Sequence, residues 1–217
     1  MTQYNKSNKS RLNRKPGRGN YDEETVNAII DEALVCHVGF IQEGMPFVIP
    51  SNFARMGDKI ILHGAKASRL MKQAASGEMI CIEMTLLDGL VLARSAFDHS
   101  VNYRSVVIFG RGELLTEHAE KMEALKAVSE HLVKGRWDEI RQPTEQELDA
   151  TAVVVIPIEE ASAKSRTGGV IDEPEDYVLP IWAGVLPLTL QALEPISDDR
   201  LVDGVTVPNH VTALLKK

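Results

Sequence analysis

The sequence predicts a mainly β protein of the α+β class, built as an antiparallel barrel or sandwich. Three observations support this prediction. Segments in which apolar and polar residues alternate recur along the chain, short turns such as Glu43-Gly44 separate them, and helical periodicity is confined to a few places. Frequent strands joined by short turns are typical of antiparallel folds, whereas a parallel sheet needs a crossover helix between strands.

The composition is that of one ordinary globular domain. The chain has 217 residues, of which 44% are hydrophobic and 25% charged, which excludes disorder for most of it. A net charge of −7 argues against a nucleic-acid partner. Cys36 and Cys81 are the only cysteines, which suits a reducing compartment. No apolar run reaches the roughly 20 residues of a membrane span, and the polar N-terminus predicts no secretory signal. We expect a cytoplasmic protein with no membrane partner.

Residues 1–20 differ from the rest, and we expect a flexible basic arm followed by a single domain over residues 21–217. The arm has no acidic residue and carries the cations Lys6, Lys9, Arg11, Arg14, Lys15 and Arg18. It could bind an anion or nucleic acid. Alternatively, it is a solvated tail or a segment draped over its own acidic body.

The first half of the domain contains one helix and most of the strands. Apolar residues at helical spacing predict a helix over 22–34, capped by Asn20 or Asp22. Alternation then predicts strands at 35–42, 45–55, 59–63, 79–87, 90–97 and 103–115, with Asp88-Gly89 as a hairpin turn. A short helix with Leu70, Met71 and Ala74 on its apolar face follows the strand 59–63.

The second half begins with two helices. Helical spacing predicts one over 117–133, and Thr144 to Glu147 form a capping-box pattern at the start of another. The β-branched segment 151–158 is expected to be the last long strand, followed by a loop over 160–180 and an apolar segment over 181–188.

The segment from His63 to Leu70 is the most informative candidate site. Gly64 permits a sharp turn, and the helix that follows begins with free backbone N–H groups. Lys66, Ser68 and Arg69 add two cations and a hydroxyl at the same place. This combination predicts a phosphate site. The alternative is an exposed basic helix start.

Two further segments could line a cleft. Residues 95–105 are unusually polar for a stretch between apolar strands, and they could bind a polar ring or satisfy their own backbone. The basic segment 162–166 is followed by Trp182, which could wall a flat aromatic ligand or belong to the core. His37, His63 and His99 with Glu83 show no metal-binding spacing, so we expect no metal site.

These segments, in this order, resemble the pyridoxamine 5′-phosphate oxidase-like flavin-binding split-barrel superfamily. The resemblance is to the flavin-nucleotide-binding branch that includes the nitroimidazole-resistance proteins, and it runs from about Arg11 to Pro208. The residues that carry it are 36–40, 46–50, 63–70, 85–95, 100–106, 164–166 and 182–185.

The resemblance implies a six-stranded antiparallel split β-barrel with flanking helices, assembled as a homodimer with flavin at the subunit interface. It implies FMN, in preference to FAD, with the phosphate at Lys66, Ser68 and Arg69. It also places His63 near the flavin ring and substrate, and because an imidazole titrates near neutral pH, we expect His63 to be the catalytic proton donor. The remaining cofactor-binding residues it indicates are Pro50, Ser51, Gly64, Ala67, Asn102, Tyr103, Ser105, Lys164, Arg166 and Trp182.

The C-terminus departs from the vitamin-forming oxidase. The only tryptophans are Trp137 and Trp182, and the chain reads Val207-Pro208-Asn209-His210 where that enzyme has an Arg-Leu-x-Pro segment. We therefore expect an FMN-dependent oxidoreductase that reduces a small nitro-aromatic or quinone-like compound and not pyridoxamine phosphate. The alternatives are a non-catalytic flavin-binding or sensing protein and a haem-binding relative.

Overall fold

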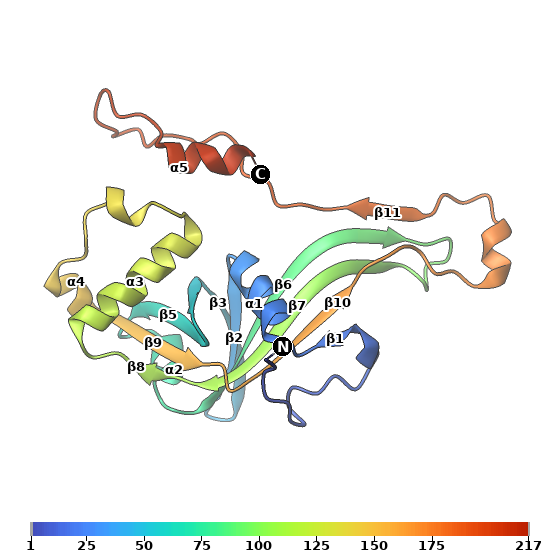
Figure 1. The fold of residues 1–217 in the computed structure, drawn as a ribbon, viewed down its shortest axis with the longest axis horizontal. Helices are drawn as coiled ribbons and strands as arrows, with labels where there is room; N and C mark the ends of the chain where they lie inside the picture. Colours follow the sequence, from blue (N-terminus) through green and yellow to red (C-terminus); the bar gives the residue numbers. More distant parts are fainter. Residues whose placement is uncertain (1, 217) are drawn as a thin grey trace.

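The computed structural model describes residues 2–216, and its larger unit is a seven-stranded antiparallel sheet (Figure 1). The order of the strands is β1-β10-β7-β6-β2-β3, and β11 pairs with the far half of β6. Their bounds are β1 (Gly19–Asn20), β2 (Cys36–Gln42), β3 (Met45–Ser51), β6 (Met79–Leu92), β7 (Ser100–Arg111), β10 (Glu160–Arg166) and β11 (Gly184–Pro187). The predicted hairpin at Glu43-Gly44 joins β2 to β3, and both turn residues have positive φ.

A second antiparallel sheet has four strands in the order β4-β5-β9-β8. These are β4 (Phe53–Met56), β5 (Lys59–Ala65), β8 (Glu113–Leu114) and β9 (Thr151–Pro157). The helices are α1 (Glu23–Glu32), α2 (Arg69–Ala74), α3 (His118–Leu132), α4 (Glu145–Ala150) and α5 (Asn209–Thr212), with 3₁₀ turns η1 (Pro16–Arg18), η2 (Trp137–Glu139), η3 (Pro174–Val178) and η4 (Ala213–Lys216). The predicted capping box begins α4, and Asp22 caps α1.

The main core lies between the two sheets and is closed by α1 and α2. Its fully buried side chains come from both sheets, for example Val38, Ile60, Ile82 and Ile108. A smaller apolar cluster packs α3 against the outer face of the four-stranded sheet. The predicted class, mainly β with an antiparallel split barrel and flanking helices, is confirmed. There are more strands than the six expected, because short edge strands and the C-terminal segment add to the sheets.

The predicted turn at Asp88-Gly89 is wrong. β6 continues through this point to Leu92, and its pairing with β7 shifts register between Leu87 and Gly89. Strands β6 and β7 therefore form a β-bulge at this point, and glycine is common in bulges as well as in turns. A side chain at Gly89 would meet Leu186 O at 3.1 Å, so the residue also allows β11 to approach β6.

The prediction of a loop over 160–180 is wrong for its first part, because Glu160–Arg166 forms β10. This strand pairs with β7 along its whole length, and Ala161 and Ala163 are buried. Its small and polar residues have low strand propensity, so the strand forms through its pairing and burial and not through local preference.

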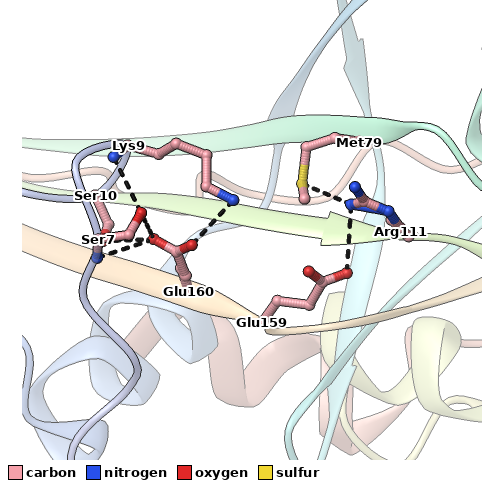
Figure 2. Close-up of polar contacts among 7 residues, drawn as sticks. All are labelled: Ser7, Lys9, Ser10, Met79, Arg111, Glu159 and Glu160. Atoms are coloured by element: carbon pink, nitrogen blue, oxygen red, sulfur yellow. Dashed lines mark hydrogen bonds and ion pairs between the residues drawn. The ribbon is translucent and has the colours of Figure 1, made fainter.

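The N-terminal arm lies along the body, as the draped interpretation predicts. β1 pairs with β10, and Glu160 at the start of β10 accepts hydrogen bonds from Ser7 and Ser10 (Figure 2). Lys9 Nζ lies 2.9 Å from Glu160 Oε1. The hydrogen bonds from Ser7, followed by Lys9, lower the pKa of Glu160 to about 2, so the carboxylate stays charged at neutral pH.

The C-terminal segment after β10 lies on the outside of the sheets and ends near α3 (Figure 1). After β11 it has little regular structure until α5, where His210 Nδ1 lies 3.4 Å from Glu139 Oε1. Many of its large apolar side chains are exposed, namely Ile171, Val178, Trp182, Leu186, Leu190, Leu193, Ile196, Val202 and Val205. Among the described residues, no helix is both long and apolar enough to cross a membrane.

Candidate functional site

The predicted phosphate site lies where β5 leads into α2, and we call Lys66, Ser68 and Arg69 the α2 cluster. Gly64 allows the tight approach of the helix, because a Cβ there would lie 3.1 Å from Met71 Cγ. Ala67 and the two cations are exposed. Within residues 2–216, neither Lys66 nor Arg69 forms an ion pair with a carboxylate.

The polar groups of the α2 cluster are available to a ligand. Ser68 is the N-cap of α2 but its hydroxyl makes no capping hydrogen bond, and the first N–H groups of a helix have no partner within it. The Arg69 guanidinium stacks on Phe47 of β3, 4.4 Å from the ring centroid. Phe47 was not predicted to belong to the site. It holds Arg69 in place without neutralising it, which favours binding of an anion.

His63 precedes the α2 cluster by three residues and Ser51 lies near His63, whereas Pro50 is the register partner of His37 on β2. Ser51 ends β3, two residues before Phe53, whose register partner Leu62 precedes His63. Burial lowers the pKa of His63 below its ordinary value of 6.5, and its buried Nδ1 has no partner among the described residues. The ring is therefore neutral at pH 7, which suits hydrogen bonding better than proton donation.

The remaining predicted residues form a second group at the paired ends of β7 and β10. Tyr103 is the register partner of Arg166, and Ser105 that of Lys164. The buried Arg166 donates hydrogen bonds to Asn102 Oδ1 and to Gly169 O. Asn102 in turn donates to Gly168 O at 3.0 Å. These contacts fix the Arg166 guanidinium without giving it a counterion.

Trp182 lies near this second group, at the tip of the β6–β7 hairpin. The Trp182 ring packs against Gly184, which is the register partner of Leu92. Trp182 is 68% exposed. It is therefore not a core tryptophan. Nearby, Asp172 accepts from the backbone and side chain of Arg94. Burial of Asp172 opposes its ionisation, but the hydrogen bonds from Arg94 prevail and the pKa is lowered.

One chain does not bring the two groups together. Arg69 of the α2 cluster stacks on Phe47, whose partner Phe40 lies in register beside the start of β6, whereas the second group lies around Leu87, the partner of Tyr103. Eight residues of extended strand span roughly 25 Å. The predicted site residues therefore form two separate clusters in this chain.

The N-terminal arm contributes a cavity that the sequence analysis did not locate. Arg14, Lys15 and Arg18 line a hollow of about 410 Å³ together with residues 97–100 at the hairpin tip, Arg166 and Ile171. They also line an adjoining hollow of about 210 Å³ with Ser100, Tyr103 and Lys164. We call both hollows together the arm cavity. The excess of cations in residues 1–20 was the available signal.

A third hollow lies on the outer face of β2. It measures about 380 Å³ and is lined by His37, Gly39, Val48, Cys81 and Glu83. His37 Nδ1 lies 3.5 Å from Glu83 Oε2, which leaves Nε2 available. Burial raises the pKa of the Cys81 thiol, and that of Cys36 to about 12, so both cysteines remain protonated as expected for unreactive thiols. Residues 2–216 contain no group of three or more His, Cys, Asp or Glu arranged to hold a metal ion.

Comparison with solved structures finds relatives over nearly the whole chain. The chain is similar to the flavocytochrome Anf3 from Azotobacter vinelandii, with 41% identity, a TM-score of 0.89, and coverage of 96% of this chain and 97% of that one. It is also similar to the FAD- and haem-binding protein from Mycobacterium smegmatis, with 31% identity, a TM-score of 0.86, and coverage of 91% and 97%. No curated protein matches.

The nitroimidazole-resistance resemblance extends to the fold. A proposed 5-nitroimidazole antibiotic resistance protein from Bacteroides thetaiotaomicron has a TM-score of 0.58 at 24% identity, covering 67% of this chain and 85% of that one. The sequence family described as pyridoxamine 5′-phosphate oxidase matches residues 22–165. This match spans more than half of the chain and both sheets, and the chain belongs to the pyridoxamine 5′-phosphate oxidase family of split-barrel proteins.

Proposed function

We propose that this protein is a flavoprotein that also binds haem and acts as an oxidoreductase. The observation that carries the proposal is the full-length similarity to a flavocytochrome and to a FAD- and haem-binding protein. Matches over more than nine-tenths of the chain must include most of the C-terminal segment, which lies outside the family match at residues 22–165. The whole chain, and not only its barrel, therefore corresponds to these two proteins.

The α2 cluster fits the phosphate of a flavin. Two cations without carboxylate partners, a free hydroxyl and the first N–H groups of α2 lie within a few residues. When bound, a flavin supplies electron transfer in one- and two-electron steps. The chain's own contribution is to anchor the phosphate, and to offer His63 as a neutral hydrogen-bonding group near Ser51.

The α2 cluster can be tested by flavin uptake. The double variant Lys66→Ala, Arg69→Ala is expected to bind FMN at least 100-fold more weakly, because each charged hydrogen bond contributes about 1.5–3 kcal/mol. Lys72→Ala, a cation at the other end of the same helix, is the control. Equal FMN affinity in the double variant and the control would make the cluster a basic surface only.

His37 is the residue that best fits a haem ligand. A metal-bound histidine commonly has its other ring nitrogen held by a carboxylate, and Glu83 lies against His37 Nδ1. The hollow beside it has mostly apolar walls of Gly39 and Val48. Neither cysteine fits, because each thiol is held protonated.

Haem reconstitution tests this assignment. His37→Ala is expected to lose the Soret band on titration with haemin while still binding flavin. His118→Ala is the control, since His118 lies on α3 and its Nε2 is 2.9 Å from Asp149 Oδ1. A full Soret band in His37→Ala, or none in the wild type, would contradict the haem assignment.

We further propose a homodimer in which the two clusters of site residues come from different copies. The roughly 25 Å between the clusters along extended strand supports this. So do the apolar side chains that the C-terminal segment leaves exposed, such as Leu190 and Ile196. Such a dimer would complete two flavin sites at its interface.

A turnover assay distinguishes a catalytic flavoprotein from a protein that only binds flavin. The wild type, loaded with flavin, is expected to transfer electrons from a reduced pyridine nucleotide to a quinone or nitro-aromatic acceptor. Absence of turnover with either acceptor, in protein that retains its flavin, would favour the non-catalytic alternative.

A further inference from the structure

The N-terminal arm is fastened to β10 at two separate points, and the first is the carboxylate of Glu160. The hydroxyls of Ser7 and Ser10 donate hydrogen bonds to Glu160 Oε2 at 2.6 and 2.9 Å. Lys9 Nζ lies 2.9 Å from the other carboxylate oxygen, Oε1 (Figure 2). Ser10 is only 2% exposed, so this part of the arm is docked on the body and is not a solvated tail. We call Ser7, Lys9, Ser10 and Glu160 the arm latch.

The second fastening point is β1, at the other end of the arm. β1 pairs with β10 over only two residues, beginning with Gly19 opposite Lys164. Leu12 packs against this point, because a Cβ on Gly19 would lie 2.5 Å from Leu12 Cδ1. Residues 11–18 therefore form a span between two fastened ends.

The span lies across the second group of predicted site residues and carries positive charge. Its cations line the arm cavity together with members of that group: Arg14, Lys15 and Arg18 from the span, and Tyr103, Lys164 and Arg166 from β7 and β10. Within residues 2–216, no carboxylate forms an ion pair with the three cations of the span. Gly17 borders open space, since nothing lies within 4 Å of a Cβ there. The ends of the span therefore hold it in place.

We propose that the N-terminal arm is a strap that closes over the second group, and that Glu160 is the positioning residue that keeps it closed. This rests on the proposed function, because the ligand that the closed strap retains is the flavin. Glu160 acts through the arm and not on the ligand, since it begins β10 whereas Arg166 ends it. About 20 Å of extended strand separates the two residues. When the arm latch opens, the span swings about β1 and the second group is exposed to solvent. Segments that open and close in this way commonly control ligand release.

Glu159 provides a matched comparison for Glu160, because the two carboxylates are neighbours in the sequence but have different partners. The carboxylate of Glu159 lies 3.9 Å from Arg111 of β7 and not against the arm (Figure 2). Backbone pairing places Glu160 opposite Phe109, so the register of β10 does not require the Glu160 side chain. Glu160→Ala is therefore expected to free the arm and leave β10 in place, whereas Glu159→Ala leaves the arm latch intact.

Limited digestion with trypsin measures the arm latch in flavin-free protein. Cleavage depends on the fraction of molecules in which the arm is open. Glu160→Ala is expected to be cut after Arg11 or Arg14 roughly tenfold faster than the wild type and Glu159→Ala, because hydrogen bonds to a charged group are lost. Lys9→Gln removes only the ion pair of an exposed side chain, and a smaller increase in the same direction is expected.

The exchange of FMN measures what the strap controls. Release of FMN on dilution and its uptake by flavin-free protein are both followed by the fluorescence of free flavin. Glu160→Ala is expected to release FMN roughly tenfold faster and also to take it up faster, because an open strap obstructs neither direction. Loss of a residue that only binds the flavin would speed release without speeding uptake. Glu159→Ala is expected to match the wild type in both rates.

Two results would overturn the proposal. One is equal cleavage of the arm in Glu160→Ala and Glu159→Ala, which would mean that Glu160 does not hold the arm. The other is wild-type rates of FMN uptake and release in Glu160→Ala although its arm is cleaved faster. If the wild type takes up no flavin, the proposed function fails and the retention of flavin fails with it. The cleavage assay still reports on the arm latch in that case, so the two failures are distinguishable.

Discussion

Burial controls the protonation of the titratable groups near the predicted flavin site. His63 and Cys36 lie on strands that face the core, and in each case burial favours the neutral form. By contrast, Glu160 at the start of β10 is held ionised by the N-terminal arm. At the residue scale, burial therefore holds His63 and Cys36 neutral, and contacts with the arm hold Glu160 charged.

The lowered pKa of His63 predicts a pH-dependent loss of stability. The unfolded state binds a proton near pH 6.5, whereas the folded state binds it only at lower pH, so stability falls as the pH drops below about 6.5. His63→Gln is expected to remove this part of the acid sensitivity. Urea unfolding at pH 7.5 and pH 5.5 measures it, and an identical pH difference in wild type and variant would contradict the assignment.

At the scale of elements, close approaches of backbone depend on particular glycines. A Cβ at Gly110 of β7 would lie 2.2 Å from Pro157 O and 2.8 Å from Ile156 Cγ2 of β9. Since the obstructing oxygen belongs to the backbone, it cannot rotate away. This contact brings the two sheets together at the crossing of β7 and β9.

Gly110→Ala is therefore expected to destabilise the fold by about 2 kcal/mol or more, as overpacking does in cores. Gly17→Ala is the control, because nothing lies within 4 Å of a Cβ there and its φ is not positive. Both are measured by urea unfolding. Equal midpoints for the two variants would show that the contact relaxes easily.

Elements with a local signal were predictable from the sequence, and those that depend on distant partners were not. The turn at Glu43-Gly44 and the capping box at Thr144 are each determined by residues that are neighbours in the sequence, and both occur as predicted. The dipeptide Asp88-Gly89 is compatible with either a hairpin turn or a β-bulge. The pairing of β6 with β7 and β11 selects the bulge. β10 lacks strand-forming residues and exists because β7 lies beside it.

The same distinction applies to the candidate sites. The α2 cluster lies within four consecutive residues, so charge and turn chemistry were sufficient to find it. The arm cavity joins residues near 15, 98 and 165, which no local pattern connects. Phe47 beneath Arg69 was missed for the same reason.

At the scale of the whole molecule, the C-terminal segment is the feature that one chain does not explain. Its apolar side chains Leu190, Leu193 and Ile196 are each more than three-quarters exposed. In the dimer that we propose, they pack on the second copy. Side chains of this kind rarely remain in contact with water over a contiguous stretch.

Removal of residues 190–217 is therefore expected to convert a dimer into a folded monomer. β11 and the Arg94–Asp172 ion pair remain in this truncated chain. The full-length variant Leu190→Ser, Leu193→Ser, Ile196→Ser is expected to weaken the dimer in the same direction. Light scattering after gel filtration measures the mass, and a wild-type monomer would contradict the dimer.

The decisive measurement is the absorption spectrum of the purified full-length protein, with identification of every chromophore released on denaturation. We predict a flavin together with haem, seen as flavin bands and a Soret band. A colourless protein that takes up neither added flavin nor haemin would contradict the proposed function, and would reduce the α2 cluster and the His37 hollow to surface features.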